Sequence, residues 1–278
     1  MKFSVLIAHY NNAKLFEDCY NSLLKQTHQN WEAIILDDAS ELQEKLEIQK
    51  LISGDSRFLY YENDKNSGVG ITKSKLIELA TGEICGFVDP DDAILPNAIA
   101  KAIDVFEKNK NVVLTYSQFM KCDEHLQPIS PFKSAMQVPN NDPYFFNYPV
   151  QIAHFVCFRK NIYEQTEKMD ATKKISEDQD LYLKMYEKGN VKFINKTNYL
   201  YRTHNGGISQ NDNKKNSYEY WGEVIFNAMK RRDLKEINGQ KIPERFTNSE
   251  EIFKLLDYQN STAFRIKKKL NIIFQSFS

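Results

Sequence analysis

The sequence predicts an α/β protein, with a mostly parallel sheet flanked by helices and a helical C-terminal extension. In the first half of the chain, apolar runs of strand length alternate with helical periodicities, which is the order typical of parallel sheets covered by helices. From Tyr218 onward the pattern is helical to the end. The predicted strands of the first half are residues 3–8, 32–37, 57–62, 84–89 and 112–117.

The connections between these strands carry helix signals. Apolar residues at the spacing of one helix face occur over 16–24 and 99–106. Ser40, followed three residues later by Gln43, predicts a capping box that opens a helix directly after the strand 32–37.

The pattern becomes irregular after residue 117. Residues 127–149 are rich in Pro, Asn and Asp, which predicts a long loop over the sheet. Strands resume at 154–159 and 191–194, with a helix at about 178–187 between them. The polar segment 205–216, which contains two adjacent glycines, predicts a mobile loop.

Composition limits the class of protein. The 278 residues include 37 Lys+Arg and 37 Asp+Glu, so the formal net charge is zero and no nucleic-acid partner is expected. The four cysteines are far apart in apolar surroundings, which indicates reduced, buried thiols. The apolar run 5–8 is too short for a signal-peptide core, and no run reaches the roughly 18 residues needed to cross a bilayer. We therefore expect a cytoplasmic protein.

Carboxylates follow two strands of the alternating half. Asp38 comes directly after the strand 32–37, and Asp89, Asp91 and Asp92 follow the strand 84–88. Ligands of open α/β sheets bind outside the carboxyl ends of strands, and clustered carboxylates suit Mg²⁺ or Mn²⁺, which could neutralise a diphosphate. Alternatively, Asp-Pro-Asp-Asp forms a turn, and Asp37 to Ser40 is an N-capped connection between a strand and a helix.

Seven motifs in order over about 205 residues resemble glycosyltransferases of family 2, which have the GT-A fold. The N-terminal strand ending in Tyr10-Asn11 resembles the family's opening strand and turn. The remaining matches are Gln26-Thr27 with Trp31-Glu32, Asp37-Asp38-Ala39-Ser40, Asn66-Ser67-Gly68, Asp89-Pro90-Asp91-Asp92, Glu177-Asp178 and Tyr201-Arg202-Thr203-His204.

The resemblance implies an inverting transferase that moves a sugar from a nucleotide-diphosphate donor to a glycan or lipid-linked glycan. It implies that Asp178 is the general base, with Glu177 on the acceptor side. A divalent metal, Mn²⁺ or Mg²⁺, would be bound by Asp91 and His204 and would stabilise the leaving diphosphate. The residues implied for the donor are Ala8, Tyr10, Asp38, Asn66, Gly68, Lys73, Asp89, Asp91, Asp92 and Arg202.

Three of these implications have alternatives. Lys73 stands where the family often has Arg, so it could reach a phosphate or the donor sugar, or be an exposed helical lysine. The acidic run beginning at Glu177 could be only the first turn of a helix. His9 stands where a small polar residue is common, and its ring would alter the nucleobase pocket.

The resemblance also divides the chain. Residues 1–212 would be the catalytic domain, with a nucleotide-binding half at 1–117 and an acceptor-binding half at 118–212, and residues 213–278 would be the helical extension. Acceptor specificity is expected in residues 118–175 and in the loop after His204. The motifs do not identify the nucleotide, sugar, acceptor or linkage.

Other functions fit parts of the pattern. Asp89-x-Asp91 after a strand also resembles the nucleophile motif of haloacid-dehalogenase-type phosphohydrolases. Gly68-Val69-Gly70 hints at a dinucleotide fold, although Lys73 replaces the third glycine. A catalytically inactive module that binds nucleotide-sugars is the non-enzymatic alternative.

The C-terminal extension contains two notable helical faces. An aromatic-rich face from Tyr218 to Met229 is expected to pack on the catalytic domain or on a second copy in a homodimer. Residues 264–274 mix four cations with large apolar residues and no acid, as in helices that lie on anionic membranes. Residues 262–278 are thus a candidate peripheral membrane contact, and the alternative is ordinary packing with a solvated basic face.

Overall fold

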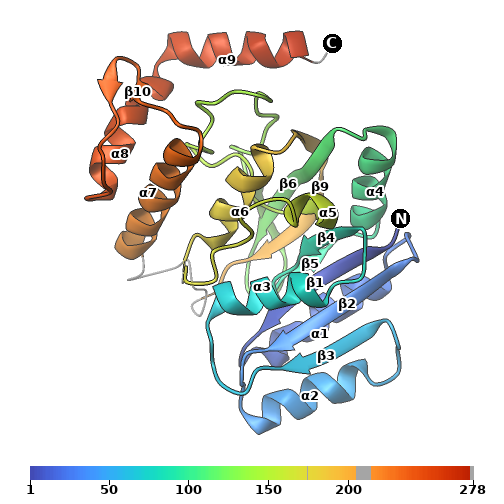
Figure 1. Ribbon diagram of the computed structural model, residues 1–278. Coiled ribbons are helices and arrows are strands. Elements are labelled where there is room, and N and C mark those ends of the chain that lie inside the picture. Colours follow the sequence, from blue (N-terminus) through green and yellow to red (C-terminus); the bar gives the residue numbers. More distant parts are fainter. Residues whose placement is uncertain (174, 205–213, 276–278) are drawn as a thin grey trace.

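In the computed structural model (Figure 1), which describes residues 1–173, 175–204 and 214–275, nine strands of these residues form one sheet covered by helices on both faces. The strands of this sheet are β1 (Phe3–His9), β2 (Trp31–Asp37), β3 (Phe58–Glu62), β4 (Ile84–Phe87), β5 (Ala93–Ile94), β6 (Val112–Cys122), β7 (Pro128–Pro131), β8 (Cys157–Arg159) and β9 (Asn190–Arg202). The helices are α1 (Ala13–Leu24), α2 (Leu42–Ile52), α3 (Val69–Leu79), α4 (Ala98–Lys108), α5 (Lys160–Tyr163), α6 (Glu177–Tyr186), α7 (Lys214–Arg231), α8 (Ser249–Leu256) and α9 (Thr262–Gln275).

The strand order is β3-β2-β1-β4-β8-β6-β9-β5, with β7 beside β6. The first four strands of this order are mutually parallel, and β6 pairs with β9 in parallel. Antiparallel pairing begins where β8 joins β4. The predicted α/β class is therefore confirmed, and the parallel strands at one side of the sheet place their carboxyl ends together.

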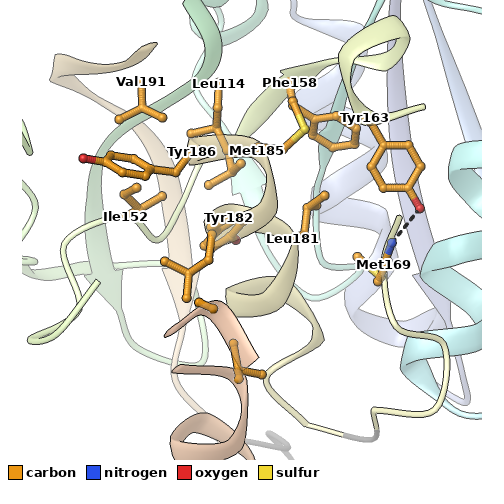
Figure 2. Close-up of a cluster of buried hydrophobic side chains, with 14 of the residues drawn as sticks. Leu114, Ile152, Phe158, Tyr163, Met169, Leu181, Tyr182, Met185, Tyr186 and Val191 are labelled. Atoms are coloured by element: carbon orange, nitrogen blue, oxygen red, sulfur yellow. Dashed lines mark hydrogen bonds between the residues drawn. The ribbon is translucent and has the colours of Figure 1, made fainter. Parts of the chain in front are cut away.

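Side-chain alternation along the strands divides the interior into two cores. In β1, Val5 and Ile7 face the core beneath α1, α2 and α4, whereas Leu6 faces the core beneath α3 and α6. Both cores are fully buried at these positions. Figure 2 shows the second core, where side chains of α6 pack against β6, β8 and β9.

The aromatic face of α7 packs within the chain. Trp221 lies 5.4 Å from the ring of Tyr148 and 5.3 Å from that of Phe253 on α8 (centroid distances). Val224 and Met229 of the same helix are completely buried. The predicted aromatic face of α7 therefore packs against other parts of the same chain. The predicted domain boundaries at residues 117 and 212 stay predictions.

One expectation about local structure was wrong and two were incomplete. Ser40 does not cap α2: the cap residue is Glu41, and the Ser40 hydroxyl instead accepts the Asn11 N–H at 2.9 Å. The predicted loop 127–149 is confirmed over 132–149, but it begins with β7 and buries Phe145 and Phe146. The C-terminal extension contains a short hairpin, β10 (Glu236–Ile237) and β11 (Gln240–Lys241), in addition to its helices.

The structure also bears on the state of the cysteines and on the presence of membrane-spanning helices. All four cysteines are buried and free, as expected. Among the helices of the described ranges, none combines the length and apolar character required to span a membrane.

A buried carboxylate fastens the amino ends of the central strands. Glu32 on β2 accepts hydrogen bonds from Ser4 Oγ of β1 at 2.7 Å and from Thr81 N before β4 at 2.7 Å, and Lys2 Nζ lies 2.5 Å away. Burial on its own raises the pKa of Glu32, but the donors from Lys2, Ser4 and Thr81 outweigh it and lower the pKa to about 2.

This shift makes the fold sensitive to acid. The ionised form of Glu32 stabilises the fold above its unfolded-state pKa, and that contribution is lost as pH falls from about 4.5 toward 2. A difference of roughly 2.5 pKa units corresponds to about 3 kcal/mol. In the parent chain, the free energy of unfolding should fall between pH 6 and pH 2. In Glu32→Gln, which cannot lose this carboxylate's charge, we predict that the decrease is smaller by about 3 kcal/mol. Urea titrations measure this, with the exposed Glu17→Gln as the control, and equal acid sensitivity of all three chains would contradict it.

Candidate active site

The predicted site residues of the N-terminal half meet at one edge of the sheet. In the parallel register, His9 at the end of β1 pairs with Asp37 at the end of β2. On the other side of β1, Leu6 pairs with Phe87 of β4, so the segment that begins at Asp89 continues toward the same edge. The carboxyl ends of β1, β2 and β4 thus bring Ala8, Tyr10, Asp38 and Asp89 to one region.

His9 and Asp37 form a buried pair beneath this edge. His9 Nδ1 lies 2.8 Å from Asp37 Oδ2, and His9 Nε2 accepts the Asn12 N–H at 3.3 Å, so Nδ1 carries the proton. Burial raises the pKa of Asp37, but hydrogen bonds from His9 and Ser40 outweigh it and lower the pKa. Because the His9 side chain is fully buried, the expectation that its ring alters a nucleobase pocket was wrong.

Asp38 organises the loop before α3. Its Oδ1 accepts from Asn63 Nδ2 at 2.8 Å and from the Ser67 N–H at 2.9 Å, and its Oδ2 accepts from the Gly68 N–H at 2.8 Å. Gly68 has φ = 86°, a left-handed conformation that favours glycine. Asn66 is exposed in this loop. Both carboxylate oxygens of Asp38 thus accept hydrogen bonds from within the protein. A contact between Asp38 and a nucleobase stays a prediction.

Tyr10 presents an exposed ring at the same edge of the sheet. It follows β1 directly, and half of its surface is exposed. A ring of this exposure at the carboxyl end of a central strand fits the predicted role of lining or stacking on a base.

Asp92 is a buried anchor of the acidic loop after β4. Its Oδ2 accepts from Tyr199 Oη at 2.7 Å and its Oδ1 accepts from the Arg202 N–H at 2.7 Å. Burial, together with the charges of Asp89 and Asp91, raises the pKa of Asp92 well above its usual range. With 1% exposure, this side chain supports the loop and has no surface to offer a donor.

Arg202 also acts from behind the loop. Its guanidinium donates to the Asp91 carbonyl at 2.6 Å, to the Glu124 carbonyl at 2.5 Å and to Asp18 Oδ2 at 2.7 Å. The side chain is 2% exposed. The structure therefore gives Arg202 a positioning role, and the expectation of direct donor binding by Arg202 and Asp92 is corrected on the ground of burial.

The two residues expected to bind a metal lie together. His204 Nε2 is 2.7 Å from Asp91 Oδ2, and each side chain is about one-fifth exposed. Carboxylate oxygen and imidazole nitrogen are suitable ligands for Mn²⁺, so this donor set fits such an ion. In the described ranges, no group of three or more His, Cys, Asp or Glu side chains is arranged to hold a metal ion by itself.

A second group of charges lies where α3 meets the start of α6. Gly70 of α3 allows close packing, because a Cβ at this position would lie 2.3 Å from the Lys173 carbonyl oxygen. One turn later, Lys73 Nζ is 2.7 Å from Glu177 Oε1. Lys73 is only 13% exposed, so the alternative of an exposed helical lysine was wrong.

The surroundings of Asp178 change its acidity. Its pKa is raised to about 6, first by burial and then by the charge of Glu177, with Asp89 adding to the shift and Lys73 opposing it. Burial lowers the pKa of Lys73, but Glu177, Asp89 and Asp178 outweigh it and raise that pKa. The charge of Asp89, which follows β4, therefore influences both Lys73 of α3 and Asp178 of α6.

Some residues near the acids could not be identified from sequence. His154, which no motif marks, stacks on Tyr199 with ring centroids 4.6 Å apart. Burial lowers the pKa of His154, while Asp89 and Asp91 raise it. Asn63 and Tyr199 also hold site carboxylates, and no motif marks them.

Two further observations define the limits of the site. A cavity of about 700 Å³ lies at the other end of α6, lined in part by Tyr186, Arg231 and Arg232, and no predicted site residue lines it. The predicted mobile loop falls mainly on 205–213, which lies outside the described residues.

Comparison with known proteins extends these observations. Residues 4–166 match the family model described as glycosyl transferase family 2. Chondroitin synthase of Escherichia coli is 28% identical over 196 residues, which cover 70% of this chain and 28% of that protein. This chain therefore spans less than a third of that relative.

Two solved structures share the fold. S. aureus TarS 1–349 in complex with UDP-GlcNAc superposes with a TM-score of 0.69 at 18% identity, over 92% of this chain and 70% of that one. The mannosyltransferase PcManGT from Pyrobaculum calidifontis, in complex with GDP-Man and Mn²⁺, gives a TM-score of 0.59 at 13% identity over 94% and 70%. At these identities the likeness concerns the fold, and it confirms the expected GT-A class.

The Asp38 network generates a stability prediction. In Asp38→Asn, an amide nitrogen would face one or more of the three N–H donors that the carboxylate now accepts. We expect a loss of about 1–3 kcal/mol of unfolding free energy, and faster amide hydrogen exchange at Ser67 and Gly68. Asp64→Asn, an exposed change in the same loop, is the matched control. Unchanged exchange at both amides in Asp38→Asn would contradict the role assigned to this carboxylate.

Proposed function

We propose that this chain, which belongs to glycosyl transferase family 2, transfers a sugar from a nucleotide-diphosphate donor to a hydroxyl of a glycan or glycoconjugate, with inversion at the anomeric carbon. The observation that carries this proposal is the convergence of the Asp89–Asp92 loop with Asp178. A carboxylate with a pKa of about 6 thereby lies near the acids expected to hold the donor. Family membership decides against the phosphohydrolase and dinucleotide interpretations of the same motifs.

The donor would bind across the carboxyl ends of β1, β2 and β4. Tyr10 offers an exposed ring for the nucleobase, and Asp38 holds the loop that carries Asn66 and Gly68 beside it. Asp89 would face the ribose. TarS and PcManGT were solved in complex with UDP-GlcNAc and GDP-Man, and we propose a nucleotide-sugar donor of this class for this chain.

Asp91 and His204 would hold a divalent cation, Mn²⁺ or Mg²⁺. The cation would supply positive charge to the leaving diphosphate. This chain's own contribution is to fix the two ligands: Arg202 holds the Asp91 carbonyl, and Asp92 holds the Arg202 backbone. The Mn²⁺ bound in the complex of the structural neighbour PcManGT supports the choice of metal.

Asp178 would act on the acceptor. Its carboxylate takes the proton of the acceptor hydroxyl while that oxygen forms a bond to the anomeric carbon. On the opposite face, the bond from the anomeric carbon to the diphosphate oxygen breaks, and the nucleoside diphosphate leaves with the bonding electrons. Glu177 stays paired with Lys73, and both residues adjust the charge around the base.

The finer assignment concerns the sugar, acceptor and location. We propose a hexosyl or N-acetylhexosaminyl transfer in surface polysaccharide synthesis, supported by the match to chondroitin synthase. Acceptor selection is assigned to residues 118–175 and the loop after His204. Four free, buried cysteines support a cytoplasmic location.

Replacing the base separates binding from catalysis. We predict that Asp178→Asn lowers acceptor-dependent release of nucleoside diphosphate by about 10²–10⁴-fold, because general-base help is lost. Stabilisation by donors with Mn²⁺, measured as the shift in Tm across UDP-, GDP- and dTDP-sugars, should persist. Glu167→Gln, with 67% side-chain exposure before α6, is the control.

Two outcomes would contradict the proposal. If no nucleotide-sugar raised Tm in the parent chain, the donor site would be refuted. If donors bound but no glycan panel supported turnover, the chain would be the inactive binding module. Unimpaired turnover in Asp178→Asn would refute the assignment of the base alone.

The pH profile should report the charges around Asp178. Because the base must be deprotonated, we predict that kcat/KM rises with pH through about pH 6 and then levels off. Lys73→Gln removes a charge that lowers the pKa of Asp178, so its midpoint should move to higher pH. Glu177→Gln removes a charge that raises this pKa, so its midpoint should move to lower pH. Shifts in the same direction, or none, would contradict the assignment.

A further inference from the structure

Helix α9 lies against the rest of the protein along one narrow side. Lys268 Nζ donates to Gln151 Oε1 at 2.5 Å and lies 5.5 Å from the ring centroid of Phe145. At the last residue of α9, the Gln275 side chain makes two hydrogen bonds with the backbone of Asn140, accepting its N–H and donating to its carbonyl. No residue of α9 within the described ranges is buried. Figure 1 shows this helix at the top of the view, separate from the sheet.

The apolar residues of α9 are on its exposed side. The spacing i, i+4, i+7 and i+8 places them within roughly 100° of the helix circumference, whereas Lys268 and Gln275 are on the opposite side. This is the reverse of an ordinary surface helix, which turns its apolar stripe toward the core. The exposed residues are Ile266 (55%), Leu270 (50%), Ile273 (51%) and Phe274 (69%).

Exposed cations border this apolar stripe. Arg265 and Lys269 flank it on one side and Lys267 on the other, and all three are exposed. Residues 258–275 contain no acid. Helix α2 offers a contrast, because its exposed Leu42 and Leu46 share the helix with Glu44 and Glu47.

We propose that α9 docks in the plane of an anionic lipid surface, with its apolar stripe in the acyl boundary and its flanking cations at the headgroups. Apolar area and positive charge on one exposed helix are the two features that such binding requires. A second copy of the chain fits this face less well. Pairing two α9 helices through the stripe would bring their cations together without an acid on either helix.

Lipid binding by α9 is separate from the proposed transfer reaction and can be tested without donor or acceptor. Flotation of the full chain with phosphatidylcholine vesicles, and with vesicles containing 30% phosphatidylglycerol, measures the partition. We expect recovery with the anionic vesicles, weaker recovery with neutral ones, and a decrease as salt rises from about 0.1 to 0.5 M.

Three variants separate the contributions. Ile266→Ser/Leu270→Ser should weaken the partition by at least about tenfold. Arg265→Gln/Lys267→Gln/Lys269→Gln should weaken it on anionic vesicles by an order of 100-fold. Leu42→Ser/Leu46→Ser on α2 is the matched control, with the same spacing and similar exposure, and it should bind like the parent chain.

Three results would overturn the proposal. The first is no recovery with anionic vesicles, and the second is equal recovery of the parent chain and the α9 variants. The third is a concentration-dependent dimer that Ile266→Ser/Leu270→Ser abolishes, in a chain that does not float, since a second copy would then cover this face. Unchanged Tm and circular dichroism in every variant exclude unfolding as the cause.

Discussion

The hydrogen bonds of the buried Asp92 carboxylate hold the acidic loop after β4 against strand β9, and the site depends on this contact. Tyr199 and Arg202 donate to the two oxygens of Asp92. The Arg202 side chain then donates to the Asp91 carbonyl, so β9 fixes the loop at two consecutive residues. Because His204 is two residues beyond Arg202, the same strand delivers the imidazole to Asp91. Losing one of these partners would leave a buried carboxylate or guanidinium unsatisfied, which is costly.

Electrostatics explain why these groups share a site in a chain with no net charge. Residues 258–278 contain four cations and no acid, so the 37 acids and 33 remaining cations of residues 1–257 give a formal charge of −4. Part of this excess is held at the carboxyl ends of β4 and in the first turn of α6. Lys73 is one of the cations in this region, where it pairs with Glu177 and lowers the pKa of Asp178. The excess of acids at the site therefore suits a bound cation. The compensating positive charge is on α9, which is far from the site residues in the sequence.

Sequence patterns predicted the parallel half of the fold well. Strand and helix periodicities located β1, β2 and β3 nearly to the residue, helped by the burial of both faces of β1 and β2. The patterns failed where one polar side chain could make either of two alternative contacts. Ser40 has a cap-like position, yet its hydroxyl accepts from Asn11, and the buried His9 is tied to Asp37 instead of facing a ligand.

The candidate site was predicted in its residues but only partly in their roles. Asp91 and His204 were expected together, and they are 2.7 Å apart. Motif spacing could not distinguish groups that face a ligand from groups that hold the loop, since this depends on the burial of Asp92 and Arg202 in the folded chain. The outward direction of the α9 stripe was likewise invisible in sequence, because it depends on which side contacts Gln151.

The most direct test of the donor site is a paramagnetic titration of the histidine side chains. Protein labelled with ¹⁵N-histidine is titrated with Mn²⁺ in the presence of UDP or GDP, and imidazole signals are followed by NMR. If Asp91 and His204 bind the metal, the signals of His204 broaden first. The signals of His28, which lies before the amino end of β2, stay sharp. Sharp His204 signals at stoichiometric Mn²⁺ with either nucleotide, or prior broadening of His28, would contradict it.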